Sequence, residues 1–236
     1  MASDIQQTPF VKQLAANDRP TRDAALASLK TYLSGRRTLA PLELLKLWKG
    51  LFYCMWMSDR PRTQQALAND LATLPSILPA ETAVPFLRAF WQTMAREWTN
   101  IDVLRMEKFL LLTRRYLGAA FELMGERGWS DEAIDKHLSL LKEIPLNVLD
   151  VKIPNGMRYH VIDIYVDELQ RAGALEAGNI PLEKLLEPLR TSAKESPTKD
   201  VRRKCKEALE DERLPGNEKQ IQEKAVTEGE WEGIED

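Results

Sequence analysis

The chain has 236 residues, 44% of them hydrophobic and 29% charged, which is the balance of an ordinary globular protein. Its net charge of −3 argues against a surface uniformly adapted to nucleic acid, and its length allows one large domain or a short helical array with a sizeable core. The two cysteines, Cys54 and Cys205, have no metal or disulfide spacing, so a reducing compartment such as the cytosol or nucleus is expected.

Helices are the elements expected along the first half of the chain. Pro20 suits a first helical turn, and apolar residues recur at steps of three and four up to Leu33, before Gly35 ends the pattern. Pro41 begins a second helix, which is expected to reach about Met57. Further helices are expected at 62–78 and 81–98.

The sequence LWKGLFYCMWMSDRP, residues 47–61, concentrates four aromatic and three sulfur-containing side chains. It could be a membrane segment, a ligand box, or a helix buried on most of its sides. Charged residues interrupt it, no stretch of about 18 apolar residues occurs, and the N-terminus lacks a secretory signal, so no membrane contact is expected. A central helix of a stack is favoured over a ligand box, with Tyr53 and Trp56 as candidates to reach the surface and bind a partner.

The longest helical pattern follows Asn100, a good residue to cap a helix start. From Val103 to Met124 apolar residues step by 3, 4, 3, 4, 3 and 4, which predicts one continuous buried stripe. Prolines bound the segment 145–156, which favours an extended connector over a lone strand. Further helices are expected at 131–143, 157–173, 181–195 and 198–212.

Roughly nine helices joined by short loops predict an all-α domain, residues 1–214, built as an irregular stack of helical hairpins. This architecture is solenoid-like, similar to HEAT or armadillo arrays, although no fixed-length sequence repeat is evident. Residues 217–236 hold seven acidic and two basic residues, so 215–236 is expected to be an extended acidic tail. Its single Trp231 is a candidate anchor for a partner, or folds back on the body of the domain.

Motifs for catalysis are not evident, and neither a metal nor a cofactor is expected. No glycine-rich phosphate loop occurs, and His137 and His160 lack partners at metal-ligand spacing. Asp163, Asp167 and Glu168 fall on one helical segment and could hold Mg²⁺ in a nuclease-like site. The preferred interpretation of these carboxylates is a solvated acidic face.

Clusters of basic residues at turns and helix ends are better candidates for function. Arginine at such places suits contact with phosphates without base recognition. One cluster alone is more often a solvated surface, but several of them in a chain without catalytic motifs predict contact with RNA or a ribonucleoprotein. The candidate RNA-binding residues are Arg36, Arg37, Arg60, Arg62, Arg105, Lys108, Arg115, Arg202, Arg203 and Lys204.

Several strings of the sequence resemble one family. They are FVKQLAANDRPTRDAALASLKTYL, LLKLWKGLFYCMWMSDRPRTQQALA and IPNGMRYHVIDIYVDEL, together with RMEKF and LLLTRRY. They are similar to the conserved N-terminal domain of the ribosomal RNA-processing protein 1 family, a eukaryotic nucleolar group, over about residues 8–170. The resemblance implies a non-enzymatic assembly factor of the large (60S) ribosomal subunit that supports pre-rRNA processing. It also implies a helical scaffold in pre-60S particles that contacts other assembly factors, ribosomal proteins and pre-rRNA.

Two other functions stay open at this point. A helical-repeat adaptor that binds only proteins would leave the basic clusters as solvated faces. A metal-dependent nuclease would use the three carboxylates named above. Many family members continue into a long basic extension, whereas this sequence closes on the acidic EGEWEGIED. Either the extension is absent or this is a trimmed chain, so the nuclear-targeting and RNA-binding functions of that extension are not assumed here.

Overall fold

The computed structural model of the protein describes residues 12–35, 38–176, 178 and 180–217. Within these residues it contains helices and turns but no strands, which confirms the expected all-α stack. The likeness to HEAT or armadillo arrays stays a prediction. The elements are α2 (Arg19–Ser34), α3 (Pro41–Trp56), α4 (Pro61–Ala72), α5 (Leu74–Ile77), α6 (Ala80–Glu97), the 3₁₀ turn η2 (Trp98–Asn100), α7 (Val103–Glu126), α8 (Asp131–Glu143), α9 (Asn155–Arg171), α10 (Leu182–Leu185), α11 (Glu187–Glu195) and α12 (Lys199–Leu209).

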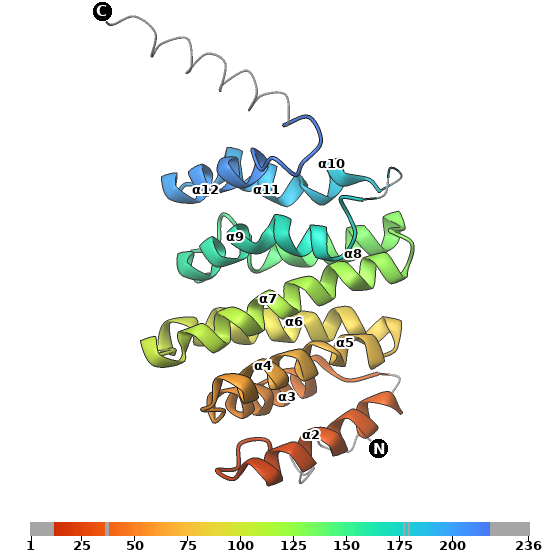
Figure 1. Ribbon diagram of the computed structural model, residues 1–236, viewed down its shortest axis with the longest axis vertical. Helices are drawn as coiled ribbons and strands as arrows, with labels where there is room; N and C mark the ends of the chain where they lie inside the picture. Colours follow the sequence, from red (N-terminus) through yellow and green to blue (C-terminus); the bar gives the residue numbers. More distant parts are fainter. Residues whose placement is uncertain (1–11, 36–37, 177, 179, 218–236) are drawn as a thin grey trace, which may run out of the picture.

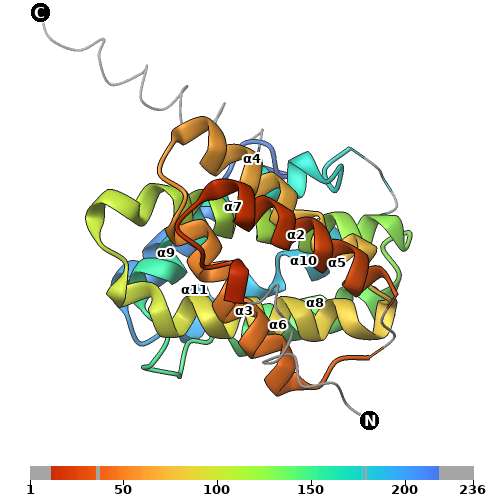
Figure 2. The same ribbon diagram turned by 90° about the horizontal axis from the view of Figure 1, so that it is seen from below.

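The helices stack in chain order along one axis, from α2 at one end to α12 at the other (Figure 1). Successive long helices run back and forth, so the connections alternate between two sides of the stack. One layer contains α3, α6, α8 and α11, and the other contains α4, α7, α9 and α12 (Figure 2). Within them α3 packs closely on α6, and α7 packs on α4 and α9, whereas α8 contacts α6 and α11 less extensively. The view along the stack in Figure 2 shows these layers side by side.

Local chemistry sets most helix starts. The side chains of Asp18, Asp102 and Ser130 each accept a hydrogen bond from a backbone N–H in the first turn of α2, α7 and α8. Asn100 was expected to cap the long helix, but it lies in η2, and Asp102 two residues later is the cap.

Two segments that were expected as single helices are broken. Residues 62–78 divide into α4 and α5, because Pro75 has no N–H to donate to the carbonyl of Leu71. The Tyr116 hydroxyl donates to that carbonyl instead, at 2.6 Å. Residues 181–195 divide in the same way into α10 and α11, just before Pro188.

The centre of the core is an aromatic cluster between α3, α6 and α7. The Trp48 ring centroid lies 4.9 Å from those of Phe90 and Tyr116, and its indole N–H donates to the Phe86 carbonyl at 3.0 Å. Most of the aromatic run is buried with it, so the prediction of a central helix is confirmed. None of the described helices is long and apolar enough to cross a membrane.

The predicted buried stripe of α7 is wrong at its start. Val103 is 88% exposed, Met106 and Leu110 are half-buried, and the stripe is fully buried only from Thr113 onward. The reason is length, since α7 has 24 residues and its neighbours α4 and α9 have 12 and 17. The first turn of α7 therefore projects beyond both of them (Figure 1).

Candidate nucleic-acid and partner interface

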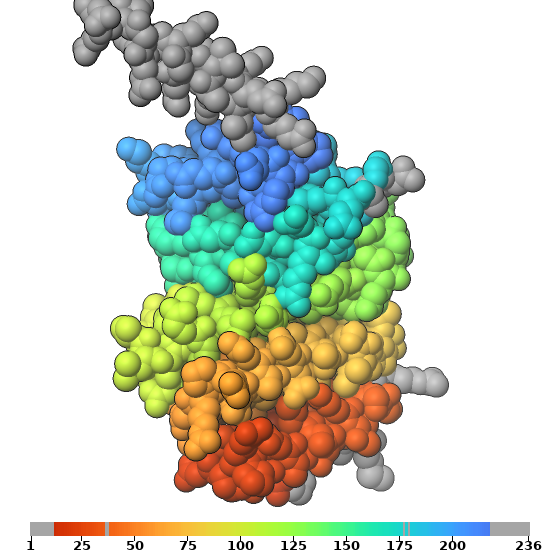
Figure 3. All heavy atoms as spheres, in the orientation of Figure 1, coloured from red at the N-terminus to blue at the C-terminus, as the bar shows by residue number. Residues whose placement is uncertain are grey.

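Several predicted functional residues gather on one side of the stack. The ends of α3, α6, α8 and α11 and the starts of α4, α7, α9 and α12 lie there, on the left in Figure 1. We call this side the turn edge. It consists of residues 53–62, 98–108, 147–155 and 196–202. Figure 3 shows the start of α7 protruding on this side.

Arg60 and Arg62 flank Pro61 at the start of α4. Both side chains are exposed, and neither has a side-chain partner among the residues that the structure describes. A helix N-terminus carries a partial positive charge, so two cations there add to the local potential, which the exposed carboxylate of Asp59 offsets in part. Anions such as phosphate bind at such helix starts. These two arginines are the best placed of the predicted set to contact a phosphate.

The two aromatic candidates differ in their availability. Tyr53 is 42% exposed, and its ring stands edge-to-face against Phe52 with centroids 5.7 Å apart. Trp56 is half-buried, and the Arg105 guanidinium lies 4.7 Å from its ring centroid. Arg105 is also bound to the carboxylate of Asp102. Tyr53 is therefore open to a partner, whereas Trp56 and Arg105 already contact each other.

Lys108 has a structural role, and its place in the predicted RNA-binding set is a correction. Its side chain is 4% exposed, and its ammonium donates to the carbonyls of Trp56 and Ser58 at 2.6 and 2.7 Å. These carbonyls end α3, where a cation is favoured by the helix dipole. Burial lowers the pKa of Lys108 to about 8. An ammonium held in this way is not available to a phosphate.

The densest basic cluster, on α12, is engaged within the protein. Arg202 donates to the carbonyls of Ser196 and Pro197 at 2.6 and 3.0 Å. Arg203 pairs with Glu207 at 2.7 Å and with Asp200 at 3.7 Å, and the pKa of Arg203 is raised chiefly by the hydrogen bond that it donates to the Glu207 carboxylate. The ion pair of Lys204 with Asp163, at 2.7 Å, joins α12 to α9. Arg202 and Lys204 thus hold α12 to the preceding turn and to α9, while the ion pairs of Arg203 lie within α12. These contacts reduce the free charge available for RNA.

Arg115 lies apart from the turn edge. Its Nε donates to Asn69 Oδ1 at 2.8 Å, which joins α7 to α4. Arg115 and Arg171 line a hollow of about 300 Å³, together with Glu122 and Glu126. The mixed charge of this hollow does not form a continuous cationic surface.

The carboxylates of the nuclease hypothesis are paired with cations. Asp167 binds Arg114 at 2.9 Å and Arg213 at 2.8 Å. Glu168 is fully buried and binds Arg114 at 2.6 Å, so the interpretation as a solvated face is wrong for this residue. Among the described residues no three His, Cys, Asp or Glu side chains are arranged to hold a metal ion. The nuclease hypothesis gains no support from this geometry.

The thiols and imidazoles are also held in the interior. Burial raises the pKa of Cys54 to about 11 and that of Cys205 to about 12, so both stay protonated and unreactive at neutral pH. Nδ1 of His137 lies 2.7 Å from the carbonyl of Ala133, and burial lowers the pKa of His137. Nε2 of His160 lies 2.8 Å from the carbonyl of Leu110.

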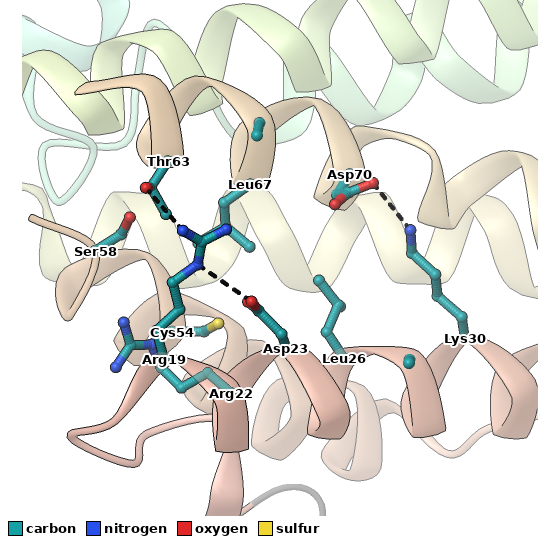
Figure 4. Close-up of a pocket in the computed structure, with 12 residues that line it drawn as sticks. Arg19, Arg22, Asp23, Leu26, Lys30, Cys54, Ser58, Thr63, Leu67 and Asp70 are labelled. Carbon is teal, nitrogen blue, oxygen red and sulfur yellow. Dashed lines mark hydrogen bonds and ion pairs between the residues drawn. The ribbon is translucent and has the colours of Figure 1, made fainter. Parts of the chain in front are cut away.

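Two buried arginines were missed from the sequence. Arg22 donates to the carbonyls of Ala16, Asn17 and Met57, between 2.7 and 3.1 Å. It lines a hollow of about 200 Å³ between α2 and α4, where Figure 4 shows the ion pairs Arg19–Asp23 and Lys30–Asp70. Arg158 likewise binds carbonyls of the α8–α9 loop. No sequence signal distinguishes these arginines from exposed ones, since their acceptors are backbone carbonyls.

Three predicted residues lie outside the described part of the chain. They are Arg36 and Arg37, which follow α2, and Trp231 in the acidic segment. The predicted domain boundary at residue 214 falls three residues before the last described position, and it stays a prediction.

The fold and the turn edge define the class of the protein as an all-helical array with an extended, partly cationic side. Comparison with protein families then identifies the family. Residues 5–235 match the family described as "Nucleolar protein, Nop52", and the chain belongs to it. The expected family and its nucleolar location are thereby confirmed.

Relatives in three animals are named as homologs of ribosomal RNA processing protein 1. The chain is 42% identical over 173 residues to "Ribosomal RNA processing protein 1 homolog A" of Mus musculus, which covers 71% of this chain and 35% of the relative. It is 40% identical over 185 residues to the Homo sapiens homolog A, covering 75% and 40%. It is 30% identical over 197 residues to the Drosophila melanogaster homolog, covering 79% and 28%. The chain therefore spans only about a quarter to two fifths of the length of these curated relatives.

Proposed function

We propose that the chain is a non-enzymatic assembly factor of the large (60S) ribosomal subunit. In this proposal it acts as a helical scaffold in the pre-60S particle and contacts pre-rRNA, other assembly factors and ribosomal proteins. The names of the relatives, which refer to ribosomal RNA processing, support a role in that process. The long sides of the stack support a scaffold, because they offer extended surfaces to several partners at once (Figure 3).

The observation that carries the RNA contact is the pair of free arginines at the start of α4. Arg60 and Arg62 are exposed, without partners among the described residues, and at the positive end of a helix dipole. Cations in this position destabilise α4 slightly, so the helix itself gives no reason for two arginines there. Contact with a phosphate would account for them.

The absence of a reaction is part of the proposal. The two thiols are buried with raised pKa values, and the carboxylates Asp163, Asp167 and Glu168 are neutralised by lysine and arginine. Nucleophiles and general bases need accessible groups with pKa values near neutrality. These groups therefore support a binding role over a catalytic one.

Ultraviolet crosslinking to RNA in cells tests the proposal with the variant Arg60→Glu/Arg62→Glu. We expect crosslinking to large-subunit pre-rRNA to fall several-fold. The two glutamates suit the start of α4 better than arginines by roughly 0.3–1 kcal/mol each, so lost folding cannot explain a fall. The control Lys49→Glu/Lys206→Glu makes the same change in charge at exposed lysines without described partners and should crosslink normally.

A protein-only adaptor is the second candidate, and the engaged basic residues of α12 favour it. Arg202, Arg203 and Lys204 all bind groups of the protein itself. If the Arg60/Arg62 variant crosslinks to pre-rRNA as strongly as the unchanged protein, the RNA contact proposed at α4 is wrong. An unchanged protein that co-purifies with pre-60S particles without RNA adducts would establish the adaptor.

A further inference from the structure

Two of the most exposed aliphatic side chains of the described residues share the loop between α8 and α9. Leu149 is 80% exposed and Val151 is 94% exposed. Side chains this exposed contribute almost no burial to the core. Neighbouring exposed apolar groups are typical of sites that bind a partner.

The loop that carries them is held in one conformation. Asn147 Oδ1 accepts from the backbone N–H groups of Leu149 and Asp150, both at 3.0 Å, and Asp150 Oδ1 accepts from the N–H of Lys152 at 2.9 Å. These bonds make successive local turns. Leu149 and Val151 are therefore presented with little conformational entropy left to lose on binding.

Arg158 fastens this loop to the first turns of α9. Its guanidinium donates to the carbonyls of Asn147 and Asp150 at 2.6 Å, to the Ile153 carbonyl, and to Asn155 Oδ1 at 2.8 Å. The side chain is 6% exposed. Arg158 therefore supports the loop from beneath and is not itself free for a ligand.

A hollow of about 200 Å³ lies between this loop and the α11–α12 turn. The apolar residues of its wall are Val148, Val151, Ile153, Pro154 and Pro197. Its polar groups are largely engaged, since Ser196 Oγ accepts from the Thr198 N–H and Arg202 donates to the Ser196 carbonyl. The apolar part of this wall can therefore hold an apolar side chain.

The free charges around the hollow are positive. Lys152 and Lys199 are exposed, and neither side chain has a partner among the described residues. The two acidic residues beside them are balanced by arginines: the charge of Asp150 acts on the Arg158 guanidinium, and Asp200 pairs with Arg203. This arrangement is complementary to a partner with acidic residues.

We propose that the α8–α9 loop and the α11–α12 turn form a docking site for an acidic peptide segment of a partner protein, with one apolar anchor residue. Leu149 and Val151 pack against the segment, the hollow takes the anchor, and Lys152 and Lys199 bind the flanking carboxylates. The inference rests on the scaffold role proposed above and specifies one class of its protein partners. It uses none of the residues that carry the RNA contact.

Photocrosslinking of the full-length protein in cells tests this site. Benzoyl-phenylalanine in place of Val151 is expected to form an adduct with a protein segment that has an apolar residue among acidic ones, identified by mass spectrometry. The same probe in place of Leu42, which is 61% exposed at the start of α3 on the other side of the stack, is the control and should not capture that segment. An RNA adduct, a segment without acidic residues, or no adduct above the Leu42 control would overturn the proposal.

Variants in the background of the Val151 probe separate docking from RNA contact. Lys152→Glu/Lys199→Glu and Leu149→Ser should each lower the adduct yield, the charge reversal by about tenfold. All three residues are exposed, so the melting temperature should not change. If these variants lose the adduct but still crosslink to RNA normally, the loss is specific to docking. If the adduct forms normally and the Arg60/Arg62 variant leaves RNA crosslinking unchanged, only the RNA contact is refuted. If neither Lys152→Glu/Lys199→Glu nor Leu149→Ser lowers the adduct yield, the docking site is overturned.

Discussion

Gly118 of α7 faces the Glu168 side chain of α9. A Cβ at this position would lie 2.5 Å from Glu168 Oε2. That carboxylate is buried and held by Arg114 at 2.6 Å, so it cannot move away without disturbing a buried ion pair. We expect Gly118→Ala to lower the free energy of unfolding by about 2–4 kcal/mol, measured in urea, through overpacking and loss of the pair geometry.

Gly125 on the same helix provides the matched control. Its Cβ would meet the ring of Trp129 at 3.3 Å, and that ring is half-buried. Alanine also favours a helix over glycine by up to about 1 kcal/mol, so Gly125→Ala should change stability by less than about 1 kcal/mol. Equal losses for the two substitutions would show that Glu168 is not the cause.

Lys108 leads to a prediction about pH. Its pKa of about 8 in the folded protein lies below the ordinary lysine value, so between these values the unfolded chain binds more protons than the folded one. Stability from this residue therefore rises with pH above about 8 and is lost as the pH falls through 8. As the pH is raised from 7 to 10, the free energy of unfolding of the wild type in urea should increase by on the order of 1–3 kcal/mol relative to that of Lys108→Met. A difference that is constant across this range would contradict the buried ammonium.

At the scale of the elements, helix starts are predictable because a proline or a cap acts within its own turn. Pro41 and Pro61 begin α3 and α4, close to the expected positions. The effect of an internal proline depends on tertiary partners. Pro75 ends α4 because Tyr116, from α7, is there to bind the freed carbonyl, whereas Pro85 is accommodated in the second turn of α6.

Dependence on tertiary partners also explains why several basic residues that were predicted to bind RNA are engaged within the protein. Sequence reveals their charge and their position at helix ends, but not the groups that they meet. Lys108 and Lys204 find acceptors about 50 and 40 residues away, which only the packing of α7 on α3 and of α12 on α9 brings near. Arg60 and Arg62 keep the solvent-facing position that their turn predicts, because none of the described elements covers the start of α4.

The whole molecule behaves as a one-dimensional array in which each hairpin packs on its neighbours. Ion pairs across α9 follow this order, since Arg114 joins it to α7 and Lys204 joins it to α12. The central helices are covered on both sides, whereas α12, the last of the described helices, packs on α9 and α11 (Figure 1). The proposed RNA contact and the docking site lie at different levels of this array, so one partner can be lost without the other.

This arrangement predicts a gradient of local stability along the stack. Twelve of the 24 residues of α7 are buried, but only Val201 and Cys205 of the 11 in α12. In arrays of this kind the end units open before the centre, because opening them exposes a single interface. We expect native-state hydrogen exchange at α12 to be faster than at α6 and α7 by on the order of a hundredfold. Lys204→Met, which removes the bond to Asp163, should increase exchange at α12 and leave α6 unchanged. Equal protection of α7 and α12 would instead indicate that the stack opens as one cooperative unit.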